Sequence, residues 1–107
     1  MPAYCIIFDV ETNGLHPSRF SVLSFSALNV QTWRTNGHRH FKVQEELDRF
    51  YYPQEAYNYY AIKVNGLTRD VIARRREKRG DKYPRHFDQD REVVDFCRQV
   101  DLAVCHN

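Results

Sequence analysis

The sequence predicts a single α/β domain of 107 residues, in which three antiparallel strands are followed by a helix and then by a parallel strand of the same mixed sheet. Three observations support this prediction. β-Branched and aromatic runs lie near the N-terminus, the turn signal Asn36-Gly37 separates two apolar segments, and apolar residues at helical spacing precede a last apolar run at residues 102–105. The 42% hydrophobic content, with seven Phe and seven Tyr, can supply a packed core.

The first strand is expected over residues 4–10, which read YCIIFDV and end shortly before the turn residues Asn13-Gly14. Asp9 and Glu11 are two positions apart at the end of this run. Because alternate side chains of a strand point to the same face, we expect the two carboxylates to project together, about 7 Å apart along the backbone.

The Asp9/Glu11 pair has two interpretations. Two close carboxylates near a core are unfavourable unless something compensates their charge. A hard divalent cation would do so, because Mg²⁺ takes oxygen ligands and is often held by one or two carboxylates with waters and substrate phosphates. Alternatively, the strand frays at Val10 and leaves both carboxylates in a solvated turn, where acidic residues are common. The pair by itself leaves both interpretations open.

The next two strands are expected on either side of the Asn36-Gly37 turn. Residues 21–32 have apolar positions with small polar residues between them, and residues 38–53 alternate at first and end in an aromatic cluster before Pro53. The short connection predicts an antiparallel pair. We expect the third strand to be interrupted around residues 45–48.

The second half of the chain is expected to be more helical. Thr68 can cap a short helical turn over residues 70–72, and residues 73–86 are expected to form a charged loop with Gly80 and Pro84. Apolar residues then recur at helical spacing, which predicts a helix over residues 88–99.

A right-handed crossover through that helix would lay the strand at 102–105 parallel to the first strand. His106 and Asn107 would then emerge at the sheet end that carries Asp9 and Glu11. Open α/β sheets bind their ligands at this end.

Composition excludes several classes of protein. No apolar run approaches the roughly 18 residues of a membrane span, and no secretory pattern is visible, so we expect a cytoplasmic (intracellular) protein with no membrane partner. Cys5, Cys97 and Cys105 lack a Cys-x-x-Cys spacing and lie among apolar neighbours, so we expect reduced core thiols. The net charge of +2 is mild, so attraction to a polyanion would depend on where the charge lies.

Three segments, in order, resemble the DEDD family of 3'-to-5' exonucleases, in its DnaQ-like (DEDDh) branch, which includes the proofreading subunit of bacterial DNA polymerase III and Trex-type enzymes. FDVETNGL, residues 8–15, is similar to the first exonuclease motif. AIKVNGLTRDVI, residues 61–72, resembles the segment after the third strand, although Asn65 replaces the usual His. LAVCHN, residues 102–107, resembles the strand that opens the second motif.

The resemblance implies a ribonuclease H-like fold and a two-metal site. Asp9 and Glu11 would be the catalytic residues and would ligate two Mg²⁺ or Mn²⁺ ions, with Asp9 between the ions. The partner would be single-stranded or 3'-ended nucleic acid, DNA in preference to RNA. The implied substrate-binding residues are Val10, Thr12, Gly14, Leu15, Leu67, His106 and Asn107, with Leu15 and Leu67 against the terminal base.

The resemblance covers essentially the whole chain but only the N-terminal part of the family's domain. In the family, a further metal-binding aspartate, a general-base histidine and a final aspartate follow. We therefore expect residues 1–107 to be the N-terminal part of a single exonuclease domain, inactive alone and prone to self-association through exposed core.

Two alternatives involve no catalysis. A basic segment would suit a nucleic-acid-binding module, or would simply be a solvated loop. Its residues are Arg69, Arg74, Arg75, Arg76, Lys78, Arg79, Lys82, Arg85 and Arg91. The aromatic segment RFYYPQEAYNYY, residues 49–60, would suit a protein-interaction surface or the core.

Overall fold

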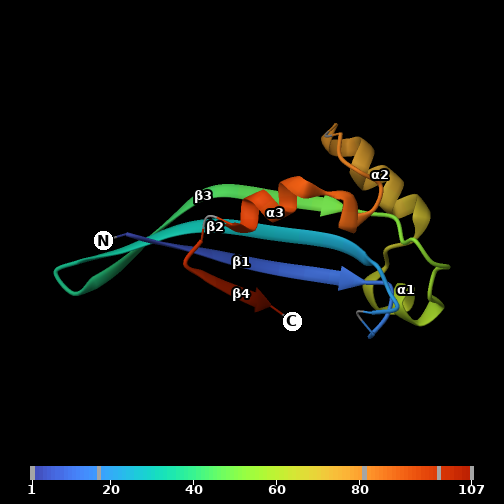
Figure 1. Cartoon of the computed structure of the whole chain (residues 1–107), viewed down its shortest axis with the longest axis horizontal. Coiled ribbons are helices and arrows are strands. Elements are labelled where there is room, and N and C mark those ends of the chain that lie inside the picture. Colours follow the sequence, from blue (N-terminus) through green and yellow to red (C-terminus); the bar gives the residue numbers. More distant parts are fainter. Residues whose placement is uncertain (1, 17, 81, 99, 107) are drawn as a thin grey trace.

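The computed structural model describes residues 2–16, 18–80, 82–98 and 100–106 (Figure 1). The chain forms three long strands, then three helices and a 3₁₀ turn, and then a short strand. In order, these elements are β1 (Ala3–Thr12), β2 (Val22–Thr35), β3 (His38–Phe50), α1 (Tyr59–Asn65), α2 (Arg69–Arg79), the 3₁₀ turn Phe87–Gln89, α3 (Arg91–Arg98) and β4 (Leu102–His106).

The strands form one mixed sheet in the order β3-β2-β1-β4. β1 and β2 are antiparallel, as are β2 and β3, whereas β4 is parallel to β1. This confirms the predicted α/β class, with three antiparallel strands and one parallel strand after a helix. Asn36 and Gly37 both have positive φ, 52° and 82°, as a tight hairpin turn requires.

The predicted interruption of the third strand is wrong. β3 runs without a break to Phe50 and accommodates one extra residue instead. Asn29 pairs with Glu45 while Val30 pairs with Val43, so Gln44 forms a β-bulge. Beyond the bulge, residues 45–50 keep strict strand alternation, which assigns each of their side chains to one face of the sheet.

The predicted loop over residues 73–86 is wrong in its first half, because α2 continues from its cap at Thr68 to Arg79. The Thr68 hydroxyl accepts a hydrogen bond from the Val71 amide at 3.2 Å, as predicted for a cap. Arg76 then ties the helix down, since its guanidinium donates to the carbonyls of Phe50, Tyr83 and Pro84 at 2.7–3.0 Å. These tertiary hydrogen bonds stabilise a helix that has little apolar periodicity.

Helix α3 begins three residues later than predicted, at Arg91, and Gln99 lies outside the described residues. The reason is Asp90, which is 4% exposed and has an extended backbone. Its carboxylate accepts two hydrogen bonds from Arg49, at 2.8 and 3.0 Å, and one from the Tyr51 hydroxyl at 2.6 Å. It also accepts from the Glu92 amide at 3.2 Å, so it caps the helix and anchors it to β3.

The two faces of the sheet differ. One face packs against Val93 of α3 and forms the larger core cluster. Its residues from the sheet include Phe8, Phe25, Ala27 and Leu47. Figure 1 shows α3 lying along β2 and β3, and α1 beyond the end of β1. A second cluster, of Leu23, Phe50, Leu67 and Ile72, joins the sheet to α2.

Parts of the aromatic segment belong to the core and parts do not. Phe50 and Tyr51 are 6% and 0% exposed, whereas Tyr59 and Tyr60 of α1 are largely exposed. Cys5 and Cys97 are half-buried, but the expectation of a core thiol is wrong for Cys105, which is exposed on β4, one of the two edge strands of the sheet.

Leu102 and Val104 on the same edge strand are exposed. The expected self-association stays a prediction. No helix among the described residues is long and apolar enough to cross a membrane.

Candidate metal and nucleotide site

Asp9 and Glu11 lie on the face of the sheet opposite α3. Their neighbours Phe8 and Val10 pack in the α3 cluster, so strand alternation directs both carboxylates the other way. Both residues are half-buried, and the structure assigns neither carboxylate a hydrogen bond or ion pair among the described side chains. The strand does not fray at Val10, because β1 continues to Thr12 and Glu11 still pairs with Ser24.

A third carboxylate, Asp48, lies in the same row across the sheet. Asp9 pairs with Ser26 of β2, and Ser26 pairs with Asp48 of β3. The Ser26 hydroxyl donates to Asp48 at 2.7 Å. These residues line a hollow of about 370 Å³ whose apolar walls include Ile7 and Leu28. Asp48 was not among the residues predicted from the sequence, although uninterrupted strand alternation through residues 45–50 would have placed it on this face.

Glu11 lines a different hollow, of about 550 Å³, at the C-terminal end of β1. This hollow combines cationic, aromatic and apolar side chains, a composition suited to a nucleotide. The lining residues are Val10, Glu11, Thr12, Gly14, Leu15, His16, Arg19, Phe20, Asn58, Tyr60, Ala61, Val64 and Asn65. Four of the predicted substrate-binding residues, Val10, Thr12, Gly14 and Leu15, are therefore brought together here.

Gly14 permits a close approach in this hollow. A Cβ at Gly14 would lie 2.3 Å from the ring of Phe20, well inside contact distance. Thr12 supports the same turn, because its hydroxyl donates to the Gly14 carbonyl at 2.6 Å.

A buried polar network holds the chain beyond β1 in place. Asn13 is fully buried. Its side-chain amide donates to the Glu55 carboxylate and to the Ala56 carbonyl, and its side-chain oxygen Oδ1 accepts from the Asn58 backbone amide, all at 2.9 Å. Glu55 also accepts from the amide and hydroxyl of Ser21, at 2.8 and 2.6 Å. Burial alone would raise the pKa of Glu55, but the hydrogen bonds from Ser21 and Asn13 outweigh it and lower the pKa below its ordinary value.

Asn65 joins the second motif segment to the first. Its amide donates to the Thr12 carbonyl at 3.0 Å, and its side-chain oxygen accepts from the Leu67 amide at 2.9 Å. Two of the three family-like segments therefore meet at the end of β1. The third meets β1 through β4, where His106 pairs with Asp9 in the parallel register.

The other predicted substrate-binding residues are placed differently. Leu15 is 96% exposed beside the hollow that Glu11 lines. Leu67 is 5% exposed and packs with Leu23, Phe50 and Ile72, and its contact with a base stays a prediction. The backbone of His106 lies in β4, and Asn107 lies outside the described residues.

Asp9 and Glu11 match one hard cation in the number and type of their ligand atoms. Mg²⁺ is commonly held by one or two carboxylates, with waters and substrate phosphates completing its shell, and Asp9 and Glu11 supply that number. Among the described residues, no group of three or more His, Cys, Asp or Glu side chains is arranged to hold a metal.

Comparison with models of protein families gives no match, and comparison with curated proteins gives none either.

Proposed function

We propose that this chain belongs to a metal-dependent 3'-to-5' exonuclease of the DnaQ-like type, on a ribonuclease H-like sheet. The main support is the position of Asp9 and Glu11. Both are half-buried carboxylates, with no hydrogen bond or ion pair among the described side chains, on the sheet face that α3 leaves uncovered. Carboxylates in such a position are unfavourable in the fold and are accounted for by a ligand.

The meeting of the three family-like segments also supports the proposal. Asn65 bonds to Thr12, and β4 lies parallel to β1, so segments far apart in the sequence converge on one end of the sheet. In this proposal Asp9 and Glu11 hold a Mg²⁺ or Mn²⁺ ion, which would polarise the scissile phosphate and activate a water. The hollow beside Glu11 receives the 3'-terminal nucleotide, with Leu15 and Tyr60 at its rim.

The metal site can be tested by titrating the 107-residue chain with Mn²⁺ and measuring the binding by calorimetry. We expect weak binding that is lost in the variant Asp9→Asn plus Glu11→Gln. The control is Asp70→Asn plus Glu77→Gln, which removes the same two charges from the exposed surface of α2. Submicromolar binding, or binding that is unchanged in the Asp9/Glu11 variant, would contradict the assignment.

The activity can be tested with a 5'-labelled single-stranded oligonucleotide, as DNA and as RNA, with Mg²⁺, Mn²⁺ or EDTA. We expect a protein that combines residues 1–107 with the further ligands implied by the resemblance to give a stepwise ladder in metal, and its Asp9→Asn variant to lose turnover by orders of magnitude while keeping its fold. The 107-residue chain should give no ladder, because a two-metal reaction needs more ligands than Asp9 and Glu11, and no group of three or more His, Cys, Asp or Glu among its described residues is arranged to hold a metal. A ladder that persists unchanged in Asp9→Asn would refute the catalytic role of this residue.

A further inference from the structure

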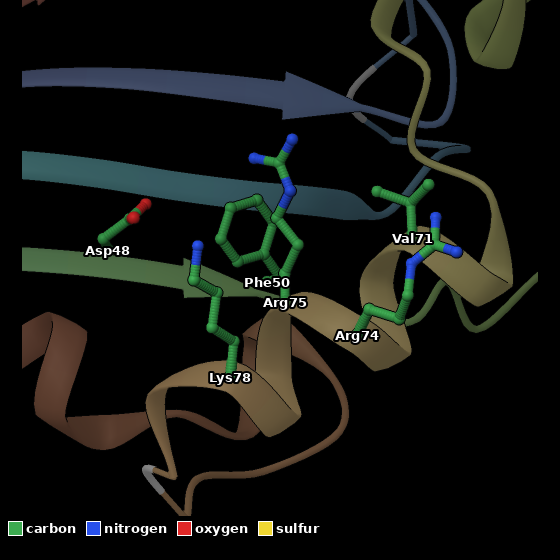
Figure 2. A pocket seen from close by; sticks show the side chains of 6 residues that line it. All are labelled: Asp48, Phe50, Val71, Arg74, Arg75 and Lys78. Atoms are coloured by element: carbon green, nitrogen blue, oxygen red, sulfur yellow. The ribbon is translucent and has the colours of Figure 1, made fainter.

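A basic hollow lies between helix α2 and the edge strand β3. It has a volume of about 560 Å³ and is lined by Asp48, Phe50, Val71, Arg74, Arg75 and Lys78. Figure 2 shows Arg75 and Lys78 rising from α2 across β3, with the Arg75 side chain over the ring of Phe50 and Arg74 beside Val71. We name this feature the α2 hollow.

Three features of the α2 hollow suit a chain of phosphates. Arg74, Arg75 and Lys78 are exposed, and all three come from one side of a single helix, so their charges act on the same space. The Arg75 guanidinium is held 5.1 Å from the centroid of the Phe50 ring. Because Arg75 is exposed, its guanidinium can still contact a base or a phosphate from the solvent side.

The position of the α2 hollow is more informative than its charge. Asp48 lines both the α2 hollow and the hollow of Asp9, so the two meet on the same face of the sheet. The register explains this, because Asp48 pairs with Ser26, which pairs with Asp9. Two strand spacings separate β3 from β1, or about 10 Å. A nucleic-acid strand bound at Asp9 therefore needs to extend only a short way to reach the cations of α2.

Arg76 is distinct from this set. Its guanidinium is used within the fold, where it donates to three backbone carbonyls and lies 4.2 Å from the centroid of the Tyr83 ring. A test of binding must therefore keep Arg76 and change only its exposed neighbours.

We propose that the α2 hollow binds backbone phosphates of single-stranded nucleic acid through Arg74, Arg75 and Lys78, on the internal side of the nucleotide that would occupy the Asp9/Glu11 site. The path of the bound oligonucleotide, from its 3' end at Asp9 and Glu11 to its internal phosphates at α2, rests on the proposed function. The binding itself requires only the cations of α2 and the open face beside them.

The test measures binding of a 5'-fluorescent single-stranded oligonucleotide by anisotropy in EDTA, with DNA and RNA arms, over a series of salt concentrations. The variant replaces Arg74, Arg75 and Lys78 by Ser. The matched control replaces Arg34, Lys42 and Arg98, two exposed arginines and one exposed lysine, by Ser. Circular dichroism checks that both variants are folded.

We expect the native chain to bind at low salt, and the α2 variant to lower the slope of log affinity against log salt concentration by about 2, from three phosphate contacts at about 0.7 each. The control should keep most of that slope. No binding by the native chain at low salt, or equal losses in variant and control, would overturn the proposal. Equally tight binding of a poly-glutamate peptide would also overturn it and would indicate an acidic protein partner.

The two proposals can fail separately. Loss of oligonucleotide binding in the α2 variant, with metal binding unaffected by Asp9→Asn plus Glu11→Gln, would support the α2 hollow and refute the metal site. Unchanged oligonucleotide binding in the α2 variant, with metal binding lost in Asp9→Asn plus Glu11→Gln, would support the metal site and refute the α2 hollow.

Discussion

Removal of the charges of Asp9 and Glu11 should make the protein more stable. The variant Asp9→Asn plus Glu11→Gln keeps the shape of both side chains and removes two negative charges. The carboxylates have no hydrogen bond or ion pair among the described side chains, so their removal breaks no contact that the structure shows. A pair that exists to bind a ligand is expected to cost stability in the ligand-free protein.

The magnitude follows from the spacing of the two residues. For two unit charges about 7 Å apart on alternate positions of a strand, Coulomb's law gives about 2 kcal/mol at an effective dielectric of about 20 and about 0.6 kcal/mol in water. The unfolded chain keeps the second value, because the two residues remain neighbours in sequence. The folded state therefore carries up to about 1–2 kcal/mol of repulsion, and the variant should regain part of it.

The assay is urea unfolding followed by circular dichroism, at neutral pH, in EDTA and low salt. We expect the free energy of unfolding of the variant to exceed that of the native chain by up to about 1–2 kcal/mol, and the difference to shrink as salt screens the charges. The control Asp70→Asn plus Glu77→Gln removes the same charge from a helix rich in arginine, so it should not raise stability.

Mg²⁺ gives the second half of the assay. At a concentration equal to its dissociation constant, a metal bound only by the folded state stabilises it by about 0.4 kcal/mol. This increment should appear in the native chain and be absent from the Asp9/Glu11 variant. A variant that is less stable than the native chain would refute the reasoning, because the carboxylates would then make contacts on which the fold depends.

Three further predictions concern the contacts that hold the fold and the end of β1 in place. Asp90→Ala should lower the free energy of unfolding by about 3–5 kcal/mol in urea melts, because it removes the buried carboxylate that pairs with Arg49 and accepts from the Tyr51 hydroxyl, and leaves Arg49 only the exposed carboxylate of Glu92; a loss under about 1 kcal/mol would show that the buried ion pair matters little. Gly14→Ala should cost about 1–3 kcal/mol through the clash with Phe20, and the added change Phe20→Ala should recover part of it; an additive loss would exclude that clash as the cause. The folded-state pKa of Glu55 is lowered, so its contribution to stability is complete above the ordinary value of 4.5 and is lost as pH falls through the lowered pKa. In the variant Glu55→Gln, the free energy of unfolding should fall less steeply as pH is lowered. A pH profile equal to that of the native chain would contradict this role of Glu55.

Local patterns accounted for the order and pairing of the strands. The apolar run that contains Asp9, the turn at Asn36-Gly37 and the last run at residues 102–105 each depend on neighbours in sequence, and each became the element expected. The parallel placement of β4 followed from the handedness of crossovers, which needs no knowledge of particular contacts. The common face of Asp9 and Glu11 followed from strand alternation.

The features that were wrong or missed depend on contacts between residues distant in sequence. Helix α2 was not expected beyond residue 72, because its charged stretch lacks apolar periodicity. The helix is instead stabilised by the Arg76 guanidinium, which donates hydrogen bonds to backbone carbonyls of other segments. Helix α3 was expected too early, because only the buried pairing with Arg49 keeps Asp90 extended.

The functional surface divides in the same way. The sequence identified Asp9 and Glu11 as a pair, since two positions in one strand define it. Asp48 joins their face only through the pairing of β1 with β2 and of β2 with β3. The cations of α2 reach that face only because Val71 and Ile72 of the helix pack in the cluster that contains Phe50. Pairing register and helix docking are set by the burial of many side chains at once, so no short stretch of sequence encodes them.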